Sequence, residues 1–290
     1  MVMYFGKVLT AMVTPFDKQG NVDLEKTTAL VNYLIDNGTD GLVVAGTTGE
    51  SPTLSAEEKL TLFSHVVKIV DKRVPVIGGT GSNNTRATVE FTRKAEATGI
   101  DAALLVTPYY NKPNQQGLYE HFSTIASSTE LPVMLYNIPG RTVVRMEAET
   151  IIKLSQIHNI VSVKESSGDL DLISRVIEET PDDFSVYSGD DSLTLPILAV
   201  GGDGIVSVAS HIIGQQMQEM VTAFQTGDVA AAAALHRKLV PVMKGLFMAP
   251  SPAPVKEALQ LKGLEVGGVR LPLVPLTTEE KQTLTDLLNR

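Results

Sequence analysis

The chain of 290 residues contains no cysteine. This absence excludes disulfide bonds, thiolate nucleophiles, thiolate zinc sites and iron–sulfur clusters. The five histidines are scattered and form no His-Glu-x-x-His motif, so a histidine zinc site is unsupported as well. Residues 78–81 (Gly-Gly-Thr-Gly) lack the final glycine of a dinucleotide-binding loop, and no Gly-x-Ser-x-Gly motif is present. We therefore expect no metal and no nucleotide cofactor.

Basic residues are fewer than acidic residues. Lysine and arginine number 24 against 33 aspartates and glutamates, which leaves a formal net charge of -9. Such a balance argues against binding to nucleic acid or to anionic lipid. No apolar run approaches the length of a membrane span, and residues 1–7 show no basic segment followed by an apolar stretch. We expect a cytoplasmic protein with neither nucleic acid nor membrane as a partner.

Short apolar, β-branched runs alternate with amphipathic stretches of helical length, as in a globular protein that is 43% hydrophobic. The expected strands begin near Val8, Leu42, Pro75, Ala102, Pro132, Ile160, Phe184 and Gly204. Helices are expected between them over residues 24–36, 55–70, 83–97, 115–127, 146–154, 170–178 and 192–199. Residues 55–58 (Ser-Ala-Glu-Glu) have the pattern of a capping box at the start of the second helix.

This alternation predicts an α/β fold. Continuous apolar strands separated by helices imply a parallel sheet that is covered on both faces. Eight such units within residues 1–225 favour a closed (β/α)8 TIM barrel over an open doubly wound sheet. Residues 226–290 contain helical patterns without strands, so we expect a C-terminal helical region packed on the barrel. Active sites of such barrels lie at the carboxyl ends of the strands.

Lys164 ends an almost wholly apolar strand, residues 160–163 (Ile-Val-Ser-Val). An ammonium at the rim of an apolar sheet loses hydration, which favours the neutral amine, a nucleophile for carbonyl carbons. Most lysines at strand ends are merely solvated. Lys7 lies at the opposite end of the barrel, and Lys112, in a loop after the fourth strand, is a weaker candidate. The pattern favours a Schiff-base enzyme in which Lys164 attacks.

The loop after the second strand, residues 46–51 (Gly-Thr-Thr-Gly-Glu-Ser), places glycines on both sides of two hydroxyl residues. Such a loop turns its backbone N–H groups toward a small anion. A carboxylate fits better than a phosphate, because the Gly-Lys-Ser/Thr ending of a phosphate-binding loop is missing. Taken alone, a plain turn before a helix is the simpler interpretation.

The fifth strand delivers Tyr136 to the rim, where its hydroxyl can donate or accept a proton. The Pro139-Gly140 pair is a turn signal that can bring Arg141 back over the barrel mouth. Arg141 could then hold a carboxylate through two parallel hydrogen bonds. The alternatives are a rim tyrosine in contact with water and an arginine in a surface ion pair.

Three further strand ends carry polar residues or glycines. Tyr109 and Tyr110 lie between prolines after the fourth strand and are candidates for proton relay or for an interface. Asp190 and Asp191 follow the seventh strand, and we expect them to cap a helix. Residues 201–207 (Gly-Gly-Asp-Gly-Ile-Val-Ser) include glycines that allow a backbone to approach a ligand closely.

Together these motifs resemble the dihydrodipicolinate synthase / N-acetylneuraminate lyase family of class I aldolases, and the resemblance extends from Gly6 to the C-terminal helices. It is carried by residues 46–50, 107–113, 136–142 and 163–168. The resemblance implies that pyruvate forms a Schiff base and condenses with L-aspartate 4-semialdehyde to give 4-hydroxy-tetrahydrodipicolinate. That reaction is the first committed step of diaminopimelate and lysine biosynthesis.

The resemblance also assigns roles to residues. The implied catalytic residues are Lys164, Tyr136, Thr47 and Tyr110, the last reaching the site of a neighbouring subunit. The implied substrate-binding residues are Thr48, Arg141, Val206 and Gly189. Lys164 would form the imine, the hydroxyl groups would move protons, and Arg141 would bind the semialdehyde carboxylate. A homotetramer built from two tight dimers is implied as well.

Some positions leave alternatives open. Family members that lysine inhibits carry a histidine, a second ring-bearing or charged residue, and a glutamate where this chain has Ala56, Lys59 and Ala87, so weak or absent inhibition is expected. The main alternative activity is a pyruvate-dependent lyase acting on N-acetylneuraminate or a 2-keto-3-deoxy sugar acid. Neuraminate lyases typically have serine where this chain has Thr47. A non-catalytic barrel is the alternative from another class.

Overall fold

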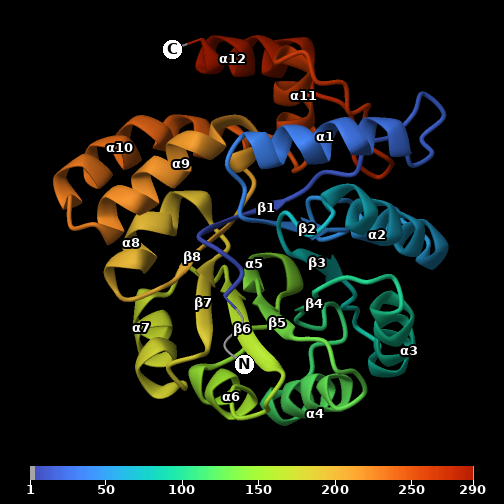
Figure 1. Ribbon diagram of the computed structural model, residues 1–290, viewed down its shortest axis with the longest axis vertical. Coiled ribbons are helices and arrows are strands. Elements are labelled where there is room, and N and C mark those ends of the chain that lie inside the picture. Colours follow the sequence, from blue (N-terminus) through green and yellow to red (C-terminus); the bar gives the residue numbers. More distant parts are fainter. Residues whose placement is uncertain (1–3, 290) are drawn as a thin grey trace.

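The computed structural model describes residues 4–289, and its centre is a closed barrel of eight parallel strands paired in sequence order from β1 to β8 (Figure 1). The strands are β1 (Val8–Ala11), β2 (Gly41–Val44), β3 (Val76–Gly79), β4 (Ala102–Val106), β5 (Val133–Asn137), β6 (Ile160–Glu165), β7 (Ser185–Ser188) and β8 (Gly204–Ser207). Strand β1 pairs with both β2 and β8, which closes the barrel. The predicted TIM-barrel fold is confirmed, with each strand beginning within one residue of its expected start.

Helices surround the barrel and link successive strands (Figure 1). They are α1 (Leu24–Asp36), α2 (Ala56–Val70), α3 (Thr85–Glu96), α4 (Gln115–Ala126), α5 (Pro139–Thr142), α6 (Ala148–Leu154), α7 (Leu170–Glu179) and α8 (Thr194–Ala199). Short 3-10 turns, η1 (Ser51–Thr53) and η2 (Asp191–Leu193), follow β2 and β7. The predicted capping box is present at Ser55, whose hydroxyl accepts from Glu58 N while the Glu58 carboxylate accepts from Ser55 N.

Two apolar layers hold the barrel together. One side-chain cluster fills the barrel interior, and it includes Leu9, Val43, Ile77, Met134 and Tyr187. A second, larger cluster joins the outer faces of the strands to the helices. Because both faces of every strand are buried, the strands contain the nearly continuous apolar runs that the sequence shows.

As far as residue 289, four helices follow β8: α9 (Ser210–Gln225), α10 (Val229–Gly245), α11 (Ala253–Leu261) and α12 (Thr278–Leu288). Helix α9 packs on α10 and α11, and α11 packs on α12 (Figure 1). The expected C-terminal helices are therefore present, and they contact the barrel through α9 and its neighbours. None of the helices in the described part of the chain has the length and apolar character needed to cross a bilayer.

His211, at the start of α9, is a buried histidine that should make the fold sensitive to acid. Its Nε2 accepts from Val13 N at 3.2 Å, and its Nδ1 lies 2.8 Å from the Val208 carbonyl oxygen. This arrangement suits a neutral ring that carries its proton on Nδ1. Burial lowers the pKa of His211 from 6.5 to about 4, so the folded chain binds fewer protons than the unfolded chain between these values.

We expect the free energy of unfolding to fall by about 2 kcal/mol between pH 7 and pH 5 on account of His211 alone. Urea unfolding at the two pH values measures this difference, and a His211→Gln variant removes the titrating ring. The loss on acidification should be smaller in His211→Gln than in the parent protein. Equal losses in both proteins would show that other groups set the acid sensitivity.

Candidate active site

Lys164 lies near the carboxyl end of β6 with only 5% of its surface exposed. It is in register with Tyr136 on β5 and Tyr187 on β7, whose side chains belong to the cluster inside the barrel. The amine therefore points inward, and its Nζ lies 4.3 Å from the centre of the Tyr136 ring. Among residues 4–289, no carboxylate forms an ion pair with this amine.

Gly189, directly after β7, provides the space that the lysine side chain occupies. A Cβ atom added at this position would lie 2.9 Å from the Cε of Lys164 and 1.9 Å from the Oγ of Ser166. Any larger residue would therefore push the amine or the serine out of place. The Ser166 Oγ is buried and has no hydrogen-bond partner among the described residues, which leaves it available to a bound molecule.

Two neighbouring cavities lie close to this lysine. The first has a volume of about 300 Å³ and the second about 560 Å³. Tyr136 lines the first cavity and Gly189 the second, while Ile138 and Arg141 line both. Lys164 is not itself part of either lining, but it lies against Tyr136 and Gly189. The amine is thus withdrawn from solvent and yet adjacent to space that a small molecule can fill.

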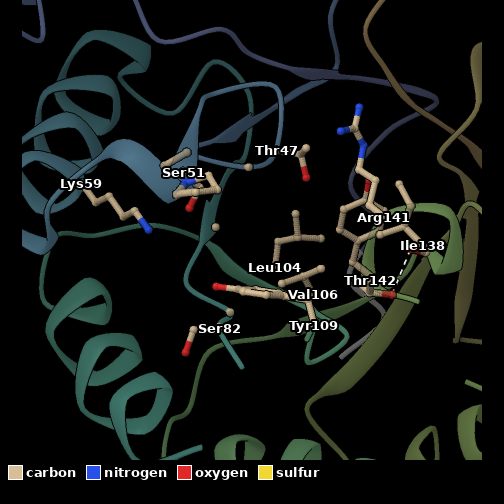
Figure 2. A pocket seen from close by; sticks show the side chains of 16 residues that line it. Thr47, Ser51, Lys59, Ser82, Leu104, Val106, Tyr109, Ile138, Arg141 and Thr142 are labelled. Carbon is tan, nitrogen blue, oxygen red and sulfur yellow. Dashed lines mark hydrogen bonds between the residues drawn. The ribbon is translucent and has the colours of Figure 1, made fainter. Parts of the chain in front are cut away.

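Hydroxyl groups and a guanidinium surround the first cavity. Thr47 and Arg141 line this space, and Figure 2 shows Lys59 and Ser51 across it from Arg141. Thr47 follows β2 and is half-buried. Arg141 is exposed and lies in α5, a single helical turn that begins at Pro139. The predicted turn therefore does bring Arg141 to the mouth of the barrel.

The remaining predicted residues lie near the cavity without lining it. Thr48 and Val206 are buried, at 5% and 1% exposure. Tyr110 is 89% exposed and is not among the residues that line the cavity, whereas its neighbour Tyr109 does line it. Tyr110 also has a left-handed backbone with φ of 72°. Of the predicted hydroxyl groups, this chain brings Thr47 and Tyr136 together and leaves Tyr110 apart.

Two buried carboxylates behind the site were missed or misplaced by sequence reasoning. Glu165 accepts from Asn137 Nδ2 at 2.8 Å and from Ser167 N at 2.6 Å, which ties the ends of β5 and β6 together. Burial raises the pKa of Glu165. Alternation along β6 could have shown it, since the residue after an inward-facing lysine faces outward toward the helices.

The expected capping role is correct for Asp190 and wrong for Asp191. Asp190 accepts from Ser192 N at 2.8 Å at the start of η2. Asp191 is instead buried, where it accepts from the Ser207 hydroxyl and from the backbone N–H groups of Val208 and Ala209. The reason is that the chain turns inward after β7, so Asp191 reaches the end of β8. Burial raises the pKa of this carboxyl group.

Fold and site together define a (β/α)8 barrel with a buried amine at its carboxyl rim. The model of the dihydrodipicolinate synthetase family matches residues 4–290, and the chain belongs to this family. A 4-hydroxy-tetrahydrodipicolinate synthase of Halalkalibacterium halodurans is 65% identical over 288 residues, 99% of each chain. The Bacillus subtilis enzyme of the same name is 62% identical over 288 residues, again 99% of each.

Solved structures show the same relationship. The crystal structure of a dihydrodipicolinate synthase from Bacillus anthracis superposes with a TM-score of 0.98 at 61% identity, covering 99% of this chain and 98% of that one. A synthase from Cyanidioschyzon merolae, solved with lysine bound, gives a TM-score of 0.96 at 46% identity, covering 98% and 97%. The resemblance inferred from the motifs is thus confirmed at the level of the family.

Proposed function

We propose that this protein condenses pyruvate with L-aspartate 4-semialdehyde to form 4-hydroxy-tetrahydrodipicolinate and water. The observation that carries the proposal is Lys164, a buried amine that lies against Tyr136 of the first cavity and Gly189 of the second. Relatives that match almost the whole chain at about 60% identity or more bear the name of this activity, which supports it further. The reaction stands at the first committed step of lysine and diaminopimelate biosynthesis.

The chemistry begins when the Lys164 amine adds to the keto carbon of pyruvate. Loss of water gives an imine, which withdraws electrons from the neighbouring methyl group. The methyl group then loses a proton and becomes an enamine, whose carbon attacks the aldehyde of the second substrate. Finally, the amino group of that substrate attacks the imine carbon, closes the ring and releases Lys164. The imine itself serves as the electron sink, so the scheme requires no metal or nucleotide.

Each proton transfer needs a nearby hydroxyl group. Tyr136 and Thr47 line the cavity beside Lys164 and are assigned to this task. Tyr110 is assigned to the site of a neighbouring subunit, a role for which its 89% exposure is suited. This assignment calls for an oligomer, and we propose a tetramer composed of two tight dimers.

Substrate binding is assigned to groups around the same space. The exposed Arg141, which lines both cavities, would hold the carboxylate of the semialdehyde through paired hydrogen bonds. Thr48 and the backbone amides of its loop would bind the pyruvate carboxylate, near the Val206 backbone. The Gly189 carbonyl group would complete the site at the second cavity.

Turnover of the two substrates by purified protein tests the proposed function. The assay follows consumption of pyruvate with L-aspartate 4-semialdehyde, and parallel reactions follow cleavage of N-acetylneuraminate and of a 2-keto-3-deoxy sugar acid. We expect rapid turnover only with the semialdehyde. Preferential cleavage of either sugar acid would contradict the proposal, and so would the absence of activity in all three assays.

Lysine should inhibit this enzyme weakly or not at all. Lys59 lines the far side of the first cavity, where it faces the enclosed space (Figure 2). A cationic side chain there repels the ammonium groups of free lysine. Alanines at positions 56 and 87 provide no opposite charge.

Initial rates at increasing lysine concentration measure this inhibition. We expect a half-inhibitory concentration in the millimolar range or above. A sub-millimolar value would contradict the interpretation of positions 56, 59 and 87. A triple variant that combines Ala56→His, Lys59→His and Ala87→Glu is the matched comparison, and it should be more sensitive to lysine than its parent.

A further inference from the structure

Lys256 and Glu50 form an ion pair that is almost wholly withdrawn from water. The Lys256 Nζ, on α11, lies 2.6 Å from Glu50 Oε1, and the two side chains are 2% and 1% exposed. Their positions differ by 206 residues in the sequence. A buried ion pair contributes little net stability, because both charges lose their hydration. We therefore expect the pair to matter mainly because it holds neighbouring parts of the chain in position.

Within residues 4–289, the Glu50 carboxylate receives hydrogen bonds only from the C-terminal region. Its second oxygen accepts from Arg270 N at 2.9 Å. Lys256 Nζ also donates to the Gly268 carbonyl oxygen at 2.6 Å and lies 4.2 Å from the centre of the Phe16 ring. The C-terminal chain thus surrounds the carboxylate with a cation and a backbone donor. Both carboxylate oxygens have partners, which keeps the side chain in a single position.

The C-terminal region also contacts the chain at the end of η1 and beyond it, through Arg270. The Arg270 guanidinium donates to the Thr53 carbonyl oxygen at 2.7 Å and pairs with the Glu58 carboxylate. It lies 4.4 Å from the Phe16 ring, which Lys256 also contacts. The stretch from Glu50 to Glu58 is therefore held at both ends by Lys256 of α11 and by Arg270, which follows α11. We call these contacts of Lys256 and Arg270 the clamp.

The backbone at Glu50 connects this clamp to the cavity. Glu50 has φ of 56° and ψ of 36°, a left-handed conformation that costs a residue with a Cβ about 1–3 kcal/mol. Its N–H donates to the Thr47 carbonyl oxygen at 3.1 Å, and the neighbouring Gly49 carbonyl oxygen accepts from the Thr14 hydroxyl at 2.7 Å. Surrounding contacts must maintain this conformation, and the hydrogen bonds of the Glu50 carboxylate to Lys256 and Arg270 are among them.

We propose that Lys256, acting through Glu50, is a positioning residue for the Thr47–Thr48 loop and thereby for pyruvate. The loop follows β2, whereas Lys164 and Tyr136 lie on β6 and β5, so losing the clamp should disturb the loop and spare the amine. Pyruvate binding should weaken more than binding of the semialdehyde, which is assigned to Arg141. Lys256 has this role in the proposed condensation, so wild-type turnover must be measured first.

The test replaces Lys256 by Met, which keeps the length of the side chain and removes its charge. In Lys256→Met we expect the KM for pyruvate, and the pyruvate concentration that half-saturates borohydride trapping, to rise by about 10- to 100-fold. The KM for the semialdehyde should change far less. Lys256→Arg should recover most of the loss. Lys281→Met breaks the more exposed pair that joins Lys281 on α12 to Glu257 on α11, and it should behave like wild type.

Wild-type pyruvate values in a folded Lys256→Met protein would overturn the proposal, and so would equal effects of Lys256→Met and Lys281→Met. Glu50→Gln provides a second route if Lys256→Met does not fold, because the amide keeps the shape of the carboxylate without its charge. Glu50→Gln should weaken pyruvate binding in the same direction, and an unchanged value would also overturn the role. Inactive wild-type protein would instead refute the proposed function, so the two failures are distinguishable.

Discussion

Replacing Lys164 by Met is expected to reduce turnover of pyruvate and the semialdehyde at least about 10³-fold. Methionine fills nearly the same volume between Tyr136 and Gly189, so the barrel should stay folded while the nucleophile is lost. Without the amine there is no imine, and hence no electron sink to acidify the methyl group of pyruvate. Steady-state rates of the purified variant, with wild-type circular dichroism as the criterion of folding, give the measurement.

Two further variants test whether the loss of activity is due to the missing amine. Lys164→Arg introduces a permanently charged group that cannot supply a neutral amine at ordinary pH, so it should be as inactive as Lys164→Met. Lys153→Met changes an exposed lysine on α6 and should leave the rate unchanged. If Lys164→Arg retained a large part of the wild-type rate, the lysine would act as a fixed charge and the covalent mechanism would be wrong.

Tyr136→Phe is expected to lower kcat by about 10²–10⁴-fold, the usual contribution of a general acid–base group. The substitution removes one oxygen atom from a side chain that is 4% exposed, so packing inside the barrel should be preserved. The ring would still lie beside the Lys164 amine, and only the proton carrier would be missing. The KM for pyruvate should therefore change much less than kcat.

Tyr119→Phe is the matched control for this tyrosine. Tyr119 is half-buried on α4 and packs against the outer core, away from both cavities. Its loss of a hydroxyl group should leave kcat as it is. An unchanged kcat in Tyr136→Phe as well would reduce Tyr136 to a packing residue at the rim and would leave proton transfer to other groups.

The architecture was predictable because its signals are local. Apolar β-branched runs at regular intervals, such as the one before Lys164, indicate strands buried on both faces, and a capping box such as that at Ser55 marks the start of a helix. Closure of the barrel followed from the number of units and the rule for parallel sheets. The small differences lie at helix ends, for example at Thr194, where a 3-10 turn precedes α8.

The contacts between buried side chains around the site are harder to predict from the sequence. The strand-end rule predicts Lys164, Tyr136 and Thr47 at one rim, and the structure has Tyr136 and Thr47 lining one cavity with Lys164 against Tyr136. No local pattern pairs Glu50 with Lys256, since the two meet only after the whole barrel and three further helices have folded. Asp191 was misassigned for a similar reason: its partners come from the following strand and helix rather than from its own turn.

The most direct test of the covalent mechanism is reduction of the wild-type protein with borohydride in the presence of pyruvate, followed by peptide mass spectrometry. We expect a pyruvate-derived adduct on the peptide that contains Lys164, and no adduct when pyruvate is omitted. Lys59, which faces the same cavity and has a pKa lowered by burial, is the internal comparison and should stay unmodified. An unmodified Lys164, or an adduct on Lys59 in its place, would contradict the mechanism.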